Sequence, residues 1–107
     1  MEIINIPKGT GKTDKLIEIA KEKGYPIIVA SKGAEVNINN KAYLKYGHFN
    51  GVTVFTVHDF MYNTNGLFTK DTKVLVDDIE NVLQAFVGFE IDTATCSIPF
   101  SKEEEIK

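Results

Sequence analysis

The stretch that decides the fold is MEIINIPKGTGKT, residues 1–13. The apolar run at 3–6 is typical of a buried strand, and the residues after it (7–11) are turn formers. Lys12 and Thr13 then open a segment whose apolar residues have helical spacing. This order predicts a glycine loop whose backbone N–H groups curl around phosphate, with the positive end of a helix dipole behind it.

Residues 6–13 match the phosphate-binding loop (P-loop, Walker A) pattern G-x-x-x-x-G-K-[ST] except at its first position, where Ile6 replaces glycine. The lysine of this pattern, here Lys12, neutralises the β- and γ-phosphates, and the hydroxyl of Thr13 ligates Mg²⁺. The alternative is a glycine-rich turn that only links a strand to a helix. The predicted nucleotide-binding residues are Lys8, Gly9, Thr10, Gly11, Lys12, Thr13 and Asp14.

Length and composition predict one globular domain. The chain has 107 residues, 43% of them hydrophobic, which is enough for one core and too few for two nucleotide-clamping lobes. We expect this domain to span 1–100 and a charged tail to follow at 101–107. Neither a membrane-spanning apolar run nor a signal peptide is expected. Cys96 has no second cysteine to pair with, so we expect a cytoplasmic protein without a membrane partner.

Strands are predicted to alternate with helices along the chain. A helix is expected from Thr13 until Gly24 closes it, others at 58–62 and 79–86, and a partial one at 41–46 behind an asparagine-rich stretch. We therefore expect an α/β domain with a mostly parallel five-stranded sheet flanked by helices, in which 3–6 is central and lies beside 74–77. The strands are predicted at 3–6, 27–30, 52–57, 73–76 and 89–94.

Two acids follow the strand predicted at 73–76. Ligands of open parallel sheets bind at the carboxyl ends of strands, so Asp77, Asp78 and the glycine loop are expected on one edge. Asp77 is predicted to hold Mg²⁺ together with Thr13, and Asp78 to activate water. The alternative is that the acid pair only caps the helix that follows.

Thr95 comes directly after the last predicted strand, at 89–94. In many nucleotide hydrolases a polar residue at this point contacts the γ-phosphate or the attacking water. Thr95 is therefore the third candidate catalytic residue, beside Lys12 and Asp78, and its alternative is a plain turn hydroxyl.

With these pieces in order, the chain resembles a minimal P-loop NTPase and is similar to the first RecA-like domain of superfamily-one DNA helicases. The resemblance implies ATP and Mg²⁺ as ligands and places Thr56 and His58 near single-stranded DNA. It departs from the family because Asp78 replaces a glutamate, the glutamine motifs are not evident and a second motor domain is missing. We therefore carry over nucleotide binding and not unwinding. The matching stretches are 28–32, 56–60, 74–78 and 93–97, in addition to the P-loop.

All twelve basic residues are lysines. Small-molecule kinases close an arginine-rich lid over the transferred phosphate, and Ras-like GTPases need an Asn-Lys-x-Asp motif, which 40–43 lacks. ATP is the expected nucleotide by elimination. The net charge of −3 argues against a dedicated nucleic-acid binder, so nucleic acid is the weaker partner.

Three functions remain open. The first is a Mg²⁺-dependent ATP-binding protein with weak or partner-activated ATP hydrolase activity. The second is a nucleotide-responsive or non-catalytic interaction module, viral or from a mobile element, that acts on another ATPase or replication protein through exposed Phe60, Met61 and Tyr62. The third is a degenerate fold that no longer binds nucleotide.

Overall fold

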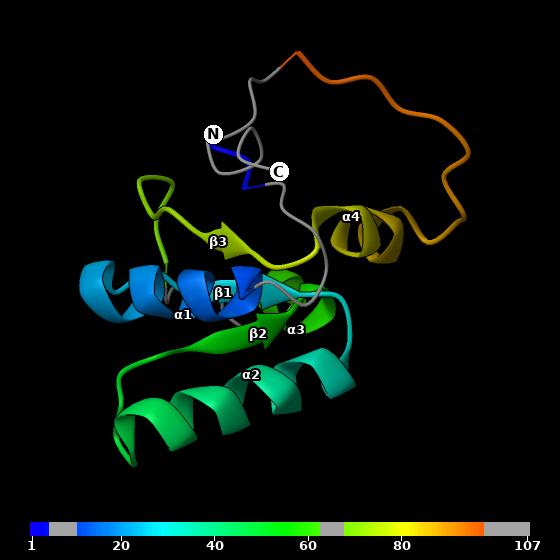
Figure 1. Cartoon of the computed structure of the whole chain (residues 1–107). Coiled ribbons are helices and arrows are strands. Elements are labelled where there is room, and N and C mark those ends of the chain that lie inside the picture. The colour runs from blue at the N-terminus through cyan, green and yellow to red at the C-terminus, as the bar shows by residue number, and fades with distance from the viewer. Residues whose placement is uncertain (5–10, 63–67, 98–107) are drawn as a thin grey trace.

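The structure, a computed structural model, describes residues 1–4, 11–62 and 68–97. Within these ranges the chain forms an α/β domain (Figure 1). No helix in this part of the chain combines the length and apolar character needed to cross a membrane. Its elements are α1 (Lys12–Lys23), β1 (Ile27–Val29), α2 (Lys32–Tyr46), β2 (Val54–Thr56), α3 (Val57–Tyr62), β3 (Leu75–Val76) and α4 (Ile79–Val87).

The sheet has three parallel strands in the order β2-β1-β3 among the described residues, so the predicted five-stranded sheet is wrong. The middle place belongs to β1, which pairs with β2 on one side and with β3 on the other. The prediction had placed 3–6 in the middle. Of that segment, residues 5 and 6 lie outside the described ranges, and Ile3 forms only an isolated β-bridge.

The predicted fifth strand, at 89–94, has no regular secondary structure. Gly88 ends α4 with a left-handed φ of 86°, and its N–H donates to the carbonyl of Gln84. The next turn of chain is held by the Gln84 side chain, whose Oε1 accepts the Ile91 N–H at 3.1 Å. The Ile91 N–H, which in a strand would donate to a carbonyl of the neighbouring strand, therefore donates to a side-chain amide oxygen.

Helix α1 confirms the expected helix, because Gly24 closes it with a φ of 75° and donates its N–H to the Ala20 carbonyl. Helix α2 is longer than predicted. Ser31 caps its start by accepting the Ala34 N–H at 3.2 Å, and Ile38 and Ala42, four residues apart, are buried on one face. The asparagines between them are exposed, so burial of this face outweighs their low helix propensity without burying a polar side chain.

The two faces of the sheet are packed differently. Ile27 and Val29 of β1 belong to the main core, which α1 and α2 cover with residues such as Ile17 and Ile38. Ile28 points to the opposite face because side chains alternate along a strand. Helices α3 and α4 contact β1 and each other on that second face.

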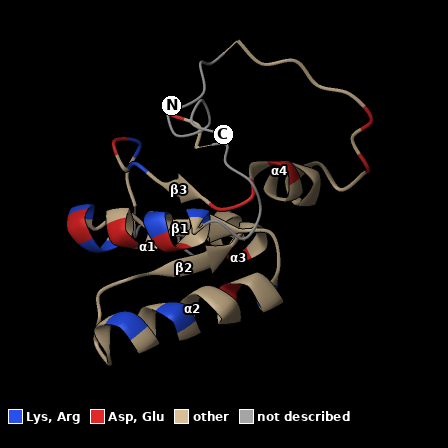
Figure 2. Cartoon of the chain, in the orientation of Figure 1, with Lys and Arg blue, Asp and Glu red and all other residues tan. Residues whose placement is uncertain are grey.

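Charge is also distributed unevenly over the described elements. Lysines lie on α1, on α2 and in the turn before β3, whereas Glu80 is the only charged residue of α4 (Figure 2). In the whole sequence, residues 57–97 contain seven carboxylates and two lysines. This segment therefore has a net charge of −5, against −3 for the whole chain.

Candidate functional site

The site is built where the start of α1 meets the end of β3. Gly11 precedes α1 in the left-handed conformation, with a φ of 88°, and Thr13 lies in the first turn. Asp77 extends the β3 ladder by one residue, because its N–H donates to the Ile28 carbonyl at 3.0 Å. The Thr13 hydroxyl donates to Asp77 Oδ1 at 3.2 Å. One hydrogen bond thus joins the predicted loop-helix junction to the predicted acidic strand.

The surroundings of the Asp77 carboxyl group disfavour its ionised form and raise its pKa. Burial raises its pKa above the ordinary value of 3.8, and the neighbouring charge of Asp78 raises it further. The hydrogen bond from Thr13 lowers the pKa, as do the ammonium groups of Lys12 and Lys41. A cation placed beside Asp77 would favour its ionised form and so offset the costs of burial and of repulsion from Asp78.

Asp78 starts α4 in an unusual way. Its φ of 66° is left-handed, a conformation that aspartate tolerates better than most residues. The Asp78 carbonyl accepts the Val82 N–H at 3.0 Å, but its side chain makes no capping hydrogen bond with the backbone. That carboxylate instead accepts the Asn81 side-chain amide. Asp78 therefore occupies the N-cap position of α4, but its side chain does not provide the cap that the alternative expected.

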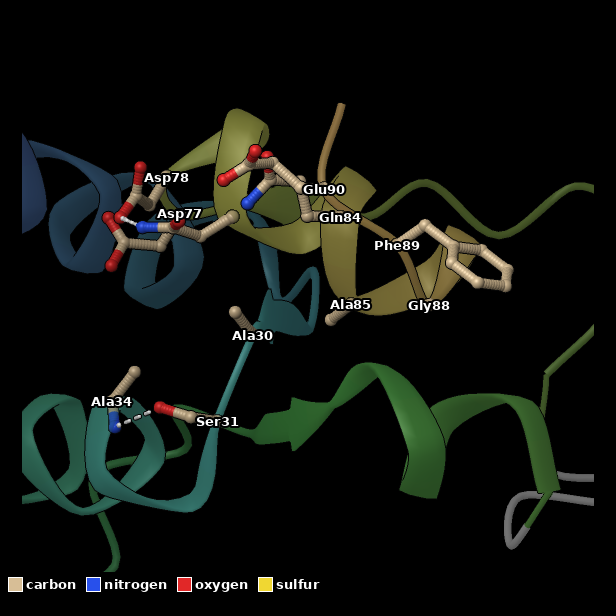
Figure 3. Close-up of a pocket in the computed structure, with 11 residues that line it drawn as sticks. Ala30, Ser31, Ala34, Asp77, Asp78, Gln84, Ala85, Gly88, Phe89 and Glu90 are labelled. Atoms are coloured by element: carbon tan, nitrogen blue, oxygen red, sulfur yellow. Dashed lines mark hydrogen bonds between the residues drawn. The ribbon is translucent and has the colours of Figure 1, made fainter. Parts of the chain in front are cut away.

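A cavity of about 670 Å³ opens beside this acid pair, between α4 and the start of α2. Figure 3 shows Asp77 and Asp78 at one end, with Ser31 and Ala34 across the cavity. The ring of Phe89 points away and is 78% exposed. The cavity is therefore polar near the carboxylates and lined by small side chains on its α2 side.

The structure brings together only part of the predicted site. Lys12 acts on the pKa of Asp77, and Thr13 contacts that carboxylate directly. Asp14 faces α2, where its carboxylate lies 3.9 Å from the Lys41 ammonium group. Thr95 is exposed in the irregular segment after α4 and is not among the residues that line the cavity. Three loop residues, Lys8, Gly9 and Thr10, lie outside the described residues.

Thr56 and His58, which the helicase resemblance placed near DNA, have a local role here. Thr56 Oγ1 accepts the Asp59 N–H at 3.1 Å, which caps α3. His58 is exposed, with its ring 4.9 Å from that of Tyr62 and its Nδ1 3.7 Å from the Asp59 carboxylate.

Sequence reasoning missed two residues of this site. Ser31 lines the cavity and caps α2, and Asn81 holds the Asp78 carboxylate. Both carried a signal in the sequence, because serine before a helix and asparagine three residues after an acid are common partners of helix starts. The alternation of strands and helices had drawn attention to strand ends alone.

The donor set suits a hard cation. Mg²⁺ prefers oxygen ligands and is commonly held by one or two carboxylates, with water and substrate phosphates completing its shell. Thr13 and Asp77 supply a hydroxyl and a carboxylate oxygen at adjacent positions. Among the described residues no group of three or more histidine, cysteine or acidic side chains could hold a metal ion by itself. Thr13 and Asp77 could therefore supply two of the oxygen ligands of such an ion.

Comparison with known proteins adds no family to this geometry. No protein-family model matches the chain, no curated protein matches it, and no solved structure matches it. The fold and site define an α/β domain with a small parallel sheet and a hydroxyl-carboxylate pair at the start of its first helix.

Proposed function

We propose that the protein binds Mg²⁺-ATP at the junction of α1 and β3 and hydrolyses it weakly, or only with a partner. The observation that carries this proposal is the hydrogen bond between Thr13 and Asp77. It joins a residue in the first turn of a helix to a carboxylate at the end of a parallel strand, and ligands of such sheets bind at strand ends.

Each residue has a distinct role in the proposal. Lys12 neutralises phosphate charge, and the N-terminus of α1 adds its dipole. Thr13 and Asp77 hold the metal, which neutralises charge on the phosphates when it is bound. Asp78, held by Asn81, orients the attacking water. Thr95 has no role in the proposal, because it is exposed and does not line the cavity beside the acid pair.

The test is thermal denaturation of the full chain with and without Mg²⁺-ATP. Ligand at 100 times its dissociation constant stabilises a protein by roughly 2.7 kcal/mol, which is readily measured in a domain of this size. We expect stabilisation by Mg²⁺-ATP and a much smaller effect from ATP with a chelator. Absence of any shift with ATP, ADP or GTP would contradict the proposal and favour a fold that no longer binds nucleotide.

An interaction module is the second candidate, and one observation favours it. Of the three α3 residues predicted for contact, Met61 and Tyr62 are 47% and 63% exposed. Phe60 is half-buried instead, because it packs against Phe55 and Phe68 with ring centroids 5.9 and 5.5 Å apart. The exposed end of α3 therefore presents apolar surface on the second face of the sheet.

A further inference from the structure

The cavity beside the acid pair is larger than a metal ion and a water molecule require. Its volume is about 670 Å³, and cavities of about 300–1,000 Å³ hold small organic ligands. Asp77, whose Oδ1 accepts the Thr13 hydroxyl, is one of the lining residues. The cavity therefore adjoins the proposed metal site, and it can hold a further part of the same ligand.

Charge decides which part of ATP can enter this cavity. Asp77, Asp78 and Glu90 line it, and none of its described lining residues is positively charged. These carboxylates would repel a triphosphate, and Lys12, the proposed phosphate-binding residue, is not among the lining residues. The uncharged nucleoside is therefore the part of ATP that fits. Its ribose hydroxyls and its amino group donate hydrogen bonds, which carboxylates accept.

Gln84 is a lining residue with the hydrogen-bonding groups to recognise a base. Figure 3 shows it on the α4 side of the cavity, between the acid pair and Phe89. Its Oε1 accepts the Ile91 N–H at 3.1 Å, and this bond orients the side-chain amide. A carbonyl oxygen has a second lone pair, and Nε2 carries two N–H donors. The oriented amide can therefore both accept a hydrogen bond from a ligand and donate one to it.

This amide edge matches adenine and not guanine. A glutamine amide can accept a hydrogen bond from the N6 amino group of adenine while it donates one to N7. Guanine has acceptors at both O6 and N7, so its O6 would face Oε1 with no hydrogen between them. Rotation of the amide to suit guanine would break the hydrogen bond with Ile91. The bond to Ile91 thus favours one base.

We propose that the adenine base of bound ATP lies in this cavity and that Gln84 distinguishes it from guanine. The inference rests on the proposed function, to which it adds the position of the nucleoside and the residue that selects the base. It also supplies a structural reason for a preference for ATP, which the sequence supported only by elimination.

The test compares four ligands on the full chain by isothermal titration calorimetry, each with Mg²⁺: ATP, GTP, 7-deaza-ATP and tripolyphosphate. 7-Deaza-ATP lacks only the N7 acceptor, and tripolyphosphate lacks the nucleoside. ATP should bind about tenfold or more tightly than GTP or tripolyphosphate, because a bidentate contact with a base discriminates by about this factor. The affinity of 7-deaza-ATP should lie between those of ATP and GTP.

A variant locates the recognition. Gln84→Glu keeps an acceptor for the Ile91 N–H but removes the donor to N7, so it should abolish the preference for ATP over GTP. The added negative charge weakens all these anions, and for this reason the ratio of the two affinities is the readout. Asn39→Asp adds the same charge at an exposed position of α2 outside the cavity, and it should keep the parent's ratio. Circular dichroism checks that both variants are folded.

The possible failures are distinguishable. Equal affinities of the parent for ATP, GTP and tripolyphosphate would contradict the inference and leave the proposed function standing, because the phosphates alone would then hold the ligand. A preference for ATP that survives Gln84→Glu would assign recognition of the base to other residues. Failure of all four ligands to bind would overturn the proposed function and this inference together.

Discussion

The hydroxyl of Thr13 donates a hydrogen bond of 3.2 Å to the carboxylate of Asp77, across 64 positions of sequence. It fixes the first turn of α1 against the end of β3, in a place where burial and Asp78 make a negative charge costly. This pair is therefore both a structural contact and the centre of the proposed ligand site. The predictions below separate these two roles.

Lys12→Ala should abolish stabilisation by Mg²⁺-ATP, because it removes the positive charge that is proposed to neutralise the phosphates. The measurement is the melting temperature with saturating nucleotide. Lys23→Ala, at the other end of the same helix, is the matched control and should respond to ATP like the parent. Equal ATP responses in the two variants would show that nucleotide does not bind at the start of α1.

Thr13→Val should lower the free energy of unfolding of the ligand-free protein by about 1–3 kcal/mol. The change removes a hydrogen bond and leaves a half-buried carboxylate without this donor. Chemical denaturation measures the loss. Thr13→Ser keeps the hydroxyl and should recover most of the stability, which distinguishes loss of the hydrogen bond from altered packing.

Ionisation of Asp77 should lower the free energy of unfolding as the pH rises above 3.8. Its folded pKa is raised, so the folded state binds more protons than the unfolded state between 3.8 and that higher pKa. The contribution of Asp77 to stability is therefore fully present below this interval and is lost as the folded carboxyl group ionises. Asp77→Asn should remove this part of the pH dependence.

The same substitution should weaken the Mg²⁺-dependent part of ATP stabilisation, since a neutral amide is a poorer metal ligand. Denaturation curves measured over a pH series, with and without Mg²⁺-ATP, check both effects. A variant with the parent's pH slope and the parent's Mg²⁺ dependence would show that Asp77 does neither.

The isolated protein should hydrolyse ATP barely above background at any protein concentration. An arginine supplied to the γ-phosphate contributes about 10³ to 10⁵ in rate where one exists, and this chain contains only lysines as cations. Specific activity across a wide range of protein concentration is the measurement. Robust turnover that rises as the chain self-associates would refute a need for a partner.

Asp78→Asn should leave ATP-induced stabilisation in place and reduce whatever hydrolysis remains. The reason is that Asp78 is proposed to act on water and not on the phosphates. Its hydrogen bond with Asn81 can be kept by an amide side chain, so the start of α4 should survive. Loss of nucleotide binding in this variant would assign Asp78 to the binding site instead.

Local signals in the sequence were sufficient for most of the helices and for three strands. Gly24 marks the end of α1, and the apolar spacing after Asp78 predicts α4, because caps and periodicity depend on residues a few positions apart. The length of helix α2 was underestimated because asparagines have low helix propensity. Only the tertiary structure shows that Ile38 and Ala42 of this helix are buried in the core.

The sequence by itself identified Lys12, Thr13, Asp77 and Asp78 as candidates, because these residue types follow a glycine loop and a buried strand. Only the tertiary structure decided which of the predicted strands pair. A strand at 89–94 needs a neighbouring edge as well as a suitable pattern, and there Gln84 holds the Ile91 N–H instead. Thr95 consequently follows an irregular segment and does not line the cavity beside the acid pair. The contact of Thr13 with Asp77 likewise depends on how α1 and β3 lie on one sheet, which no local pattern encodes.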